Sequence, residues 1–227
     1  MKWQAVIFDL DNTLLDRNKT FRKYAERFVD FHLGPLDMPT RERCIEMVRV
    51  ADRDGYRRKP ELYAELLETL PWEPARRPAH ASLLAFYDAH YVSGSHLMDD
   101  AHELLAYLRG RGARLGLVTN GRSEIQRGKV ERLGLEPYLD YILVSGEIDT
   151  EKPDPLVYET ALAGMSVAPG DAVFIGDHPE NDIMGPAGAG MDTIWLRRNQ
   201  PWMEHVAARP AATFRTLREL LDYFRRL

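Results

Sequence analysis

Short apolar runs recur along this chain and constrain its fold more than any other feature. They are rich in β-branched residues and largely continuous, which is typical of strands covered on both faces in a parallel sheet. Helical stretches at 123–133, 155–163 and 181–189 separate the later runs. This alternation predicts right-handed βαβ units, and hence an open α/β sheet that binds ligands at the carboxyl ends of its strands. The runs lie at residues 5–8, 114–118, 141–144, 172–175 and 193–196.

The segment 18–95 follows a different pattern. Apolar residues recur there at helical spacing, no strand pattern is present, and a clear break falls at Gly34-Pro35. We therefore predict an all-helical domain of four or five helices, inserted directly after the first strand. The residues on either side, 1–17 and 96–227, form the predicted sheet domain, and a chain of 227 residues is long enough for both.

Charge and composition exclude several classes of protein. The chain carries 30 Lys and Arg against 35 Asp and Glu, so its formal net charge is −5 and we predict no nucleic acid polymer as a partner. Cys44 is the only cysteine, which excludes an internal disulfide and a cysteine-rich zinc site. No apolar run approaches the roughly 18 residues that cross a bilayer, and no targeting signal is visible. We expect a cytoplasmic protein with no membrane partner, and the sequence leaves the oligomeric state open.

Acidic residues follow two of the predicted strands. Asp9 and Asp11 come directly after the first strand, and Asp177 and Asp182 follow the fourth. Taken separately, the first pair is compatible with a solvated turn and the second with the start of a helix. Carboxylates beside buried strands are unfavourable unless a positive charge lies between them. Because parallel strands deliver their carboxyl ends to one edge of the sheet, we expect all four acids at that edge.

Polar side chains of other types follow two further strands. Thr119 ends the second strand, and Asn120 precedes a helix N-terminus that favours an anion. Lys152 lies in the loop after the third strand, so it is expected at the same edge as the acids. Oxygen ligands without histidine or cysteine indicate Mg²⁺ rather than zinc. A Mg²⁺ site with a lysine and a hydroxyl beside it is suited to phosphate.

These motifs resemble those of the haloacid dehalogenase-like (HAD) superfamily, and the resemblance covers nearly the whole chain. The stretch Asp9-Leu10-Asp11-Asn12-Thr13 matches the first motif of that superfamily. The other three motifs are matched, in order, by Thr119, by Lys152 and by Gly176-Asp177 through Asp182. The resemblance implies a Rossmann-like core with an inserted helical cap. It also implies Mg²⁺-dependent phosphoryl transfer through an aspartyl phosphate.

The resemblance further implies roles for the acidic residues. Asp9 is expected to attack phosphorus, and Asp11 to act as general acid and then as general base. The expected metal site comprises Asp9, Asp177 and the backbone carbonyl of Asp11, with Asp182 contacting the metal through water or holding Lys152. Asp11 favours a phosphate ester over a carbon–halogen bond, because dehalogenases of this family lack an acid at that position.

Other residues are expected to bind the substrate. Lys152, Thr119 and the backbone amide of Asn120 are assigned to the phosphoryl oxygens. Tyr56 and Arg57 lie in a turn of the predicted cap, where they are candidates for contacting the leaving group, although a solvated helix face is the ordinary explanation for the many charges nearby. The expected substrate is a small phosphate monoester such as a nucleoside monophosphate or a sugar phosphate. Two alternatives remain open: a sugar phosphomutase, and a non-catalytic relative that binds Mg²⁺ and phosphate.

Overall fold

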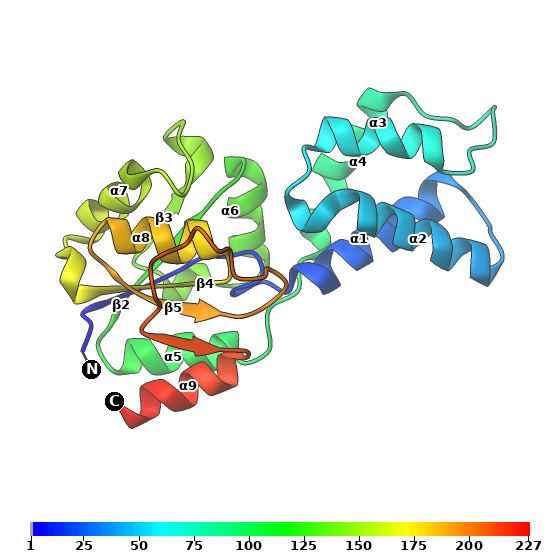
Figure 1. Cartoon of the computed structure of the whole chain (residues 1–227). Helices are drawn as coiled ribbons and strands as arrows, with labels where there is room; N and C mark the ends of the chain where they lie inside the picture. Colours follow the sequence, from blue (N-terminus) through cyan, green and yellow to red (C-terminus); the bar gives the residue numbers. More distant parts are fainter. Residues whose placement is uncertain (1) are drawn as a thin grey trace. The chain divides into compact units, whose positions relative to one another are not determined.

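A single parallel β-sheet organises the larger part of the molecule. The computed structural model describes residues 2–227, and across these residues six strands form one sheet in the order β3-β2-β1-β4-β5-β6 (Figure 1). All neighbouring strands pair in parallel, which confirms the predicted α/β class with a Rossmann-like open sheet. The strands are β1 (Ala5–Phe8), β2 (Arg114–Thr119), β3 (Tyr141–Val144), β4 (Ala172–Gly176), β5 (Asp192–Leu196) and β6 (Ala212–Phe214).

Five of these strands were predicted, and β6 was missed. It has only three residues, Ala212–Phe214, and pairs with β5 at the edge of the sheet. Its residues are exposed or half-buried, so the strand carries no continuous apolar run. Patterns of apolar residues detect strands buried on both faces and overlook a short edge strand of this kind.

Alternate residues of β1 pack into two separate layers, as the period of two along a strand requires. Val6 and Phe8 belong to a core that includes side chains from α5, α6 and α9, whereas Ala5 and Ile7 pack with side chains of α7. Figure 1 shows α5 and α9 on one side of the sheet and α7 and α8 on the other. These helices are α5 (Ala101–Gly110), α6 (Ser123–Arg132), α7 (Pro155–Met165), α8 (Gly185–Gly188) and α9 (Leu217–Arg226).

The helix predicted at 181–189 has another form. A π-helix occupies Pro179–Met184, and only Gly185–Gly188 are α-helical. Pro186 has no backbone N–H, so it cannot give the carbonyl of Asp182 an α-helical hydrogen bond. The wider π-helical turn is a feature that occurs frequently at functional sites.

The chain divides into two compact units, which we describe separately. The sheet unit comprises residues up to Asp16 together with Leu97–Leu227, and the helical unit is Arg17–His96. The roles of catalytic core (1–17 and 96–227) and cap (18–95) remain predictions. The α-helices of the helical unit are α1 (Arg17–His32), α2 (Met38–Asp52), α3 (Lys59–Thr69) and α4 (His80–His90).

Aromatic side chains fill the interior of the helical unit. Tyr24 lies at its centre, fully buried, with its ring in edge or tilted contact with Phe28 and Tyr87 and with its hydroxyl 2.5 Å from that of Tyr63. Aromatic pairs in such geometry add to the stabilisation from burial alone. None of the helices described between residues 2 and 227 combines the length and the apolar character that a membrane crossing requires.

Candidate active site

Three carboxylates meet at the carboxyl ends of the two central strands. Asp9 directly follows β1, and its backbone N–H donates to the carbonyl of Ile175 in β4 at 2.9 Å. Asp177 directly follows β4, and Asp182 lies one π-helical turn further along. One carboxylate oxygen from each acid lies within 4.8 Å of the others, and all three residues are buried. The predicted convergence of these acids is therefore present in the structure.

Lys152 places an ammonium group among these acids. Its Nζ lies 2.8 Å from Oδ1 of Asp9 and 2.7 Å from Oδ1 of Asp182. The lysine side chain is only 2% exposed, and the Asp182 side chain 1%. A buried lysine is tolerated when it is paired and hydrogen-bonded, and here both conditions hold.

Burial and neighbouring charges shift the ionisation of this cluster. Burial raises the pKa of Asp9 from its ordinary value to about 7; Lys152 opposes this shift, and the negative charge of Asp182 adds to it. For Lys152, burial alone would lower the pKa, but the carboxylates of Asp182 and Asp9 raise it above the ordinary lysine value. Asp9 is thus a carboxyl group whose negative charge needs further positive charge to be stable at neutral pH.

Hydrogen bonds that involve the backbone hold the two acidic residues that follow β4. The backbone N–H of His178 donates to Oδ2 of Asp182 at 2.9 Å, and the indole N–H of Trp195 donates to the carbonyl of Asp177 at 2.8 Å. Gly176 is required at the end of β4, because a Cβ there would collide with the Asp182 carboxylate. The surrounding structure therefore holds the Asp182 carboxylate and the backbone of Asp177 in place.

Two hydrogen bonds between the side chain of Asn120 and the backbone of Lys152 link the loops that carry these residues. The side-chain amide of Asn120 donates to the carbonyl of Lys152 and accepts from its backbone N–H, both at 2.9 Å. The backbone amide of Asn120 is predicted to contact phosphate, and the side chain of Asn120 in addition holds the backbone of Lys152. The two residues are 32 positions apart, so no local sequence pattern indicates the pair.

Asp11 and Thr119 meet at a second group of buried polar side chains. The Asp11 carboxylate is not one of the three that converge; Lys129 and Gln126 of α6 donate to it at 2.8 and 2.9 Å. Gln126 also donates to Oγ1 of Thr119 at 2.5 Å. Gln126 and Lys129 were not predicted from the sequence as residues of the site. A signal was present, since positions 126, 129, 130 and 133 have the spacing of a buried helix face and two of them are polar.

The three converging carboxylates fit a Mg²⁺ ion. They are hard oxygen ligands, they lie close enough to share one cation, and no cysteine or histidine joins their group among the described residues. Three buried acids that lie this close repel one another, and Lys152 donates to two of them, Asp9 and Asp182. A divalent cation at their meeting point would remove that repulsion. Ligation by the backbone carbonyl of Asp11 remains a prediction.

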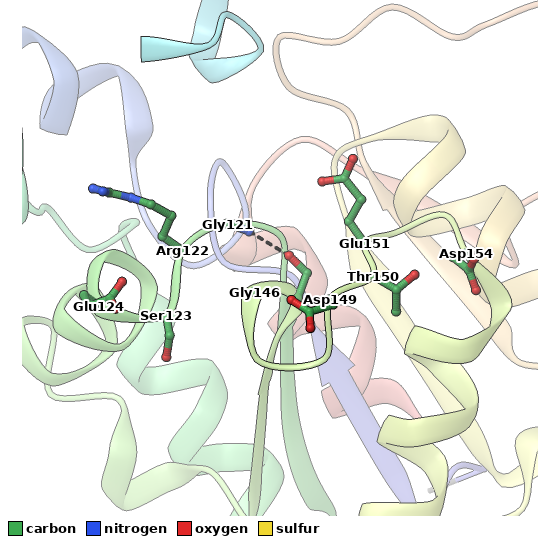
Figure 2. Close-up of a pocket in the computed structure, with 10 residues that line it drawn as sticks. Gly121, Arg122, Ser123, Glu124, Gly146, Asp149, Thr150, Glu151 and Asp154 are labelled. Carbon is green, nitrogen blue, oxygen red and sulfur yellow. Dashed lines mark hydrogen bonds between the residues drawn. The ribbon is translucent and has the colours of Figure 1, made fainter. Parts of the chain in front are cut away.

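A hollow of about 740 Å³ lies beside the site, between the loops that follow β2 and β3 (Figure 2). The backbone N–H of Gly121 donates to Oγ of Ser145 at 3.0 Å and ties these loops together. None of the converging acids lines the hollow. Its lining carries one guanidinium, from Arg122, and more carboxylates than cations, so it disfavours an anion. These carboxylates belong to Glu124, Asp149, Glu151 and Asp154.

Tyr56 and Arg57 lie in the helical unit, in the turn between α2 and α3. Tyr56 is 54% exposed, whereas the Arg57 guanidinium is mostly buried and lies 2.5 Å from the carboxylate of Glu65. Arg57 also donates to the carbonyl of Ala51, at 3.4 Å. Their predicted contact with the substrate remains a prediction.

Comparison with known proteins identifies the family. A pyrimidine 5'-nucleotidase of Streptococcus pneumoniae, PynA, is 35% identical over 230 residues, covering 98% of this chain and 95% of that protein. A glyceraldehyde 3-phosphate phosphatase of Methanopyrus kandleri is 30% identical over 200 residues, covering 87% and 85%. The crystal structure of YfnB from Bacillus subtilis, bound to magnesium, has the same fold, with a TM-score of 0.78, 24% identity and coverage of 98% and 99%. The family model for haloacid dehalogenase-like hydrolases matches residues 6–196, and the chain therefore belongs to this family of hydrolases.

Proposed function

We propose that this protein is a Mg²⁺-dependent phosphatase that hydrolyses a small phosphate monoester through an aspartyl phosphate on Asp9. The relatives named as phosphatase and nucleotidase support the class of phosphoric monoester hydrolase. One observation carries the mechanism: three buried carboxylates converge, and a buried lysine contacts both Asp9 and Asp182. Such a cluster suits a substrate that brings negative charge together with a divalent cation.

Asp9 and Asp177 would hold the metal directly, with the backbone carbonyl of Asp11. Bound Mg²⁺ would stabilise negative charge on the phosphoryl oxygens and on the Asp9 carboxylate. Asp182 already accepts from Lys152 at 2.7 Å and from the backbone of His178 at 2.9 Å. Both of its oxygens thus accept a hydrogen bond from the protein, and we assign Asp182 the role of holding Lys152.

The first half of the reaction transfers the phosphoryl group to Asp9. An oxygen of the Asp9 carboxylate forms a bond to phosphorus while the bond to the leaving oxygen breaks. Lys152 stabilises the negative phosphoryl oxygens, and the Thr119 hydroxyl, which accepts from Gln126, has its own hydrogen available to donate to one of them. Asp11 enters this step protonated and gives its proton to the leaving oxygen, so the product departs as an alcohol and Asp11 becomes a carboxylate that accepts from Lys129 and Gln126.

The second half of the reaction restores the enzyme. A water molecule attacks the phosphorus of the aspartyl phosphate, and Asp11, now a carboxylate, takes the proton of that water. The bond between phosphorus and the Asp9 oxygen breaks, inorganic phosphate leaves, and both acids regain their starting states. The buried position of Asp9 limits the access of other nucleophiles to the intermediate.

The helical unit would select the leaving group. The two relatives are named for glyceraldehyde 3-phosphate and for pyrimidine 5'-nucleotides, which differ widely beyond the phosphate. The exposed ring of Tyr56 and the guanidinium of Arg57 are the residues proposed to contact this variable part. A panel that contains triose phosphates, other sugar phosphates and nucleoside monophosphates therefore covers the relevant chemistry.

The proposal is tested by phosphate release from p-nitrophenyl phosphate, followed by the panel. We expect turnover with Mg²⁺, none with a chelator, and a loss of roughly 10³-fold or more in Asp9→Asn. The control is Asp171→Asn, since Asp171 precedes the opposite end of β4 and pairs with Gln4. Near-wild-type, Mg²⁺-dependent turnover by Asp9→Asn would exclude the mechanism. Activity that requires an added sugar bisphosphate would indicate a phosphomutase instead.

A further inference from the structure

Two polar side chains on the buried face of α6 have no assigned role. Gln126 is 2% exposed and Lys129 is 3% exposed, on the buried side of the helix, where an amphipathic helix normally presents apolar residues. A buried ammonium group is costly unless it is paired with a carboxylate and its remaining protons are bound. The contacts of these two residues therefore indicate what they hold in place.

Both side chains converge on the Asp11 carboxylate. Nζ of Lys129 lies 2.8 Å from each oxygen of Asp11 and donates to the amide oxygen of Gln126 at 2.7 Å. The amide nitrogen of Gln126 donates to Oδ2 of Asp11 at 2.9 Å and to Oγ1 of Thr119 at 2.5 Å. Every hydrogen-bonding atom of the Gln126 side chain is thus engaged, and its amide orientation is fixed by its partners.

The backbone around α6 leaves room for this arrangement. Gly121, in the loop before the helix, has a φ of +140°, and a Cβ there would lie 3.1 Å from Cγ of Gln126. A larger residue at this position would be strained and would press on the glutamine. The loop is therefore shaped so that Gln126 bridges Thr119, at the end of β2, and Asp11, after β1.

We propose that Gln126 and Lys129 are positioning residues that hold Asp11 in the orientation needed for proton transfer. The inference rests on the proposed function, in which Asp11 is the general acid and base. A side-chain carboxylate on a loop samples several rotamers, whereas three hydrogen bonds to a buried helix face select one of them. Errors of about 1 Å in such placement cost on the order of 10²-fold in rate.

The dependence of kcat/KM on the leaving group distinguishes the positioning of Asp11 from a general structural role. Protonation of the leaving oxygen matters little for p-nitrophenol, which departs readily as an anion, and much more for unsubstituted phenol. Removing the contacts to Asp11 is expected to lower kcat/KM for phenyl phosphate more than for p-nitrophenyl phosphate. A merely structural defect reduces the amount of active enzyme and lowers both values by the same factor.

The experiment measures kcat/KM for both aryl phosphates in Lys129→Met and Gln126→Met. Each substitution keeps most of the side-chain length and removes the donors, and the second one serves if the first fails to fold. We expect the preference for p-nitrophenyl phosphate to rise about tenfold in these variants. The control is Arg127→Met on the same helix, which breaks a surface ion pair with Glu147 and should leave the preference unchanged.

The same substitutions in an Asp11→Asn background complete the test. If Gln126 and Lys129 act through Asp11, they should not change the preference further once that carboxylate is gone. An unchanged preference in both folded single variants would overturn the inference while leaving the phosphatase proposal intact. A wild-type protein that releases no phosphate from either ester would overturn the phosphatase proposal, and the inference with it.

Discussion

Each unit of the molecule buries a cluster of charges, and the two clusters differ in composition. In the helical unit, the fully buried Asp52 lies 2.7 Å from the guanidinium of Arg17 and 2.5 Å from Nζ of Lys59. At the edge of the sheet, the carboxylates of Asp9, Asp177 and Asp182 converge within 4.8 Å of one another. Two cations thus contact one carboxylate in the first cluster, whereas in the second three carboxylates converge and one ammonium group, that of Lys152, contacts two of them.

This difference distinguishes a structural cluster from the one for which we propose a function. Arg17 also lies 3.5 Å from Asp54, so the helical cluster joins α1 to the turn that carries Tyr56 and Arg57. Its charges neutralise one another within the protein, as buried ion pairs must. Burial raises the pKa of Asp9 to about 7; Lys152 opposes this shift, and the negative charges of Asp182 and Asp11 add to it. Such a cluster is suited to receive a cation and a ligand.

The two clusters should differ most in how far the free energy of unfolding changes when one acid of each is neutralised. Asp52→Asn leaves two cations without their buried partner and should lower the free energy of unfolding by about 3 kcal/mol. Asp177→Asn without metal removes one of three repelling carboxylates and should cause no such loss. Chemical denaturation in the presence of a chelator measures both values. Equal destabilisation by the two substitutions would remove the distinction between the clusters.

Mg²⁺ should stabilise the sheet unit through its acids. At 100 times the dissociation constant, a ligand that binds only the folded state raises the free energy of unfolding by about 2.7 kcal/mol. We expect this gain in the wild type and its loss in Asp177→Asn, with Asp171→Asn as the matched control at the other end of β4. Denaturation with and without Mg²⁺ provides the measurement. A gain of the same size in Asp177→Asn would contradict the proposed metal site.

The stability of the metal-free protein should depend on pH through Asp9. Its pKa is raised to about 7 in the folded state, so between its ordinary pKa and pH 7 the folded state binds more protons than the unfolded state. The contribution of Asp9 to the free energy of unfolding therefore falls as the pH rises, by on the order of 2 kcal/mol between pH 5 and 7. The difference between the wild type and Asp9→Asn, both in chelator, isolates this contribution. If that difference stays constant from pH 5 to 7, Asp9 does not have a raised pKa.

The smallest expected effect concerns the turn held by the helical cluster. Arg57→Ala or Tyr56→Ala should raise KM for the physiological ester by about tenfold, since the contact to the leaving group is lost. Turnover of p-nitrophenyl phosphate should remain intact. Arg77→Ala, which breaks an exposed ion pair with Glu68 in the same unit, is the control. Equal losses on both substrates would argue that the turn has no role in specificity.

The central strands and the acids that follow them could be predicted because each is a local feature of the sequence. Continuous apolar runs located five strands, and the position of Asp9 and Asp177 after two such runs placed them at one edge. The short edge strand β6 lacks such a run, and the π-helix at Pro179–Met184 arises from packing and from the missing N–H of Pro186.

The contacts around Asp11 and Lys152 could not be predicted in the same way. Lys129 lies 118 positions after Asp11, and Asn120 lies 32 positions before Lys152. Only the folded chain brings these partners together. On a single sequence, a glutamine and a lysine on a short helix are indistinguishable from ordinary surface residues, unless their place on the buried stripe is noticed.

The most direct test of the account is the identity of the residue that carries the phosphoryl group. Asp11→Asn should form the aspartyl phosphate from p-nitrophenyl phosphate, whose leaving group needs little protonation, and should hydrolyse it slowly, because the base is missing. Acid quenching followed by peptide mass spectrometry then locates the phosphoryl group. We predict that it lies on the peptide containing Asp9. A phosphoryl group on any other residue, or release of p-nitrophenol with no modified protein at any time, would contradict the account.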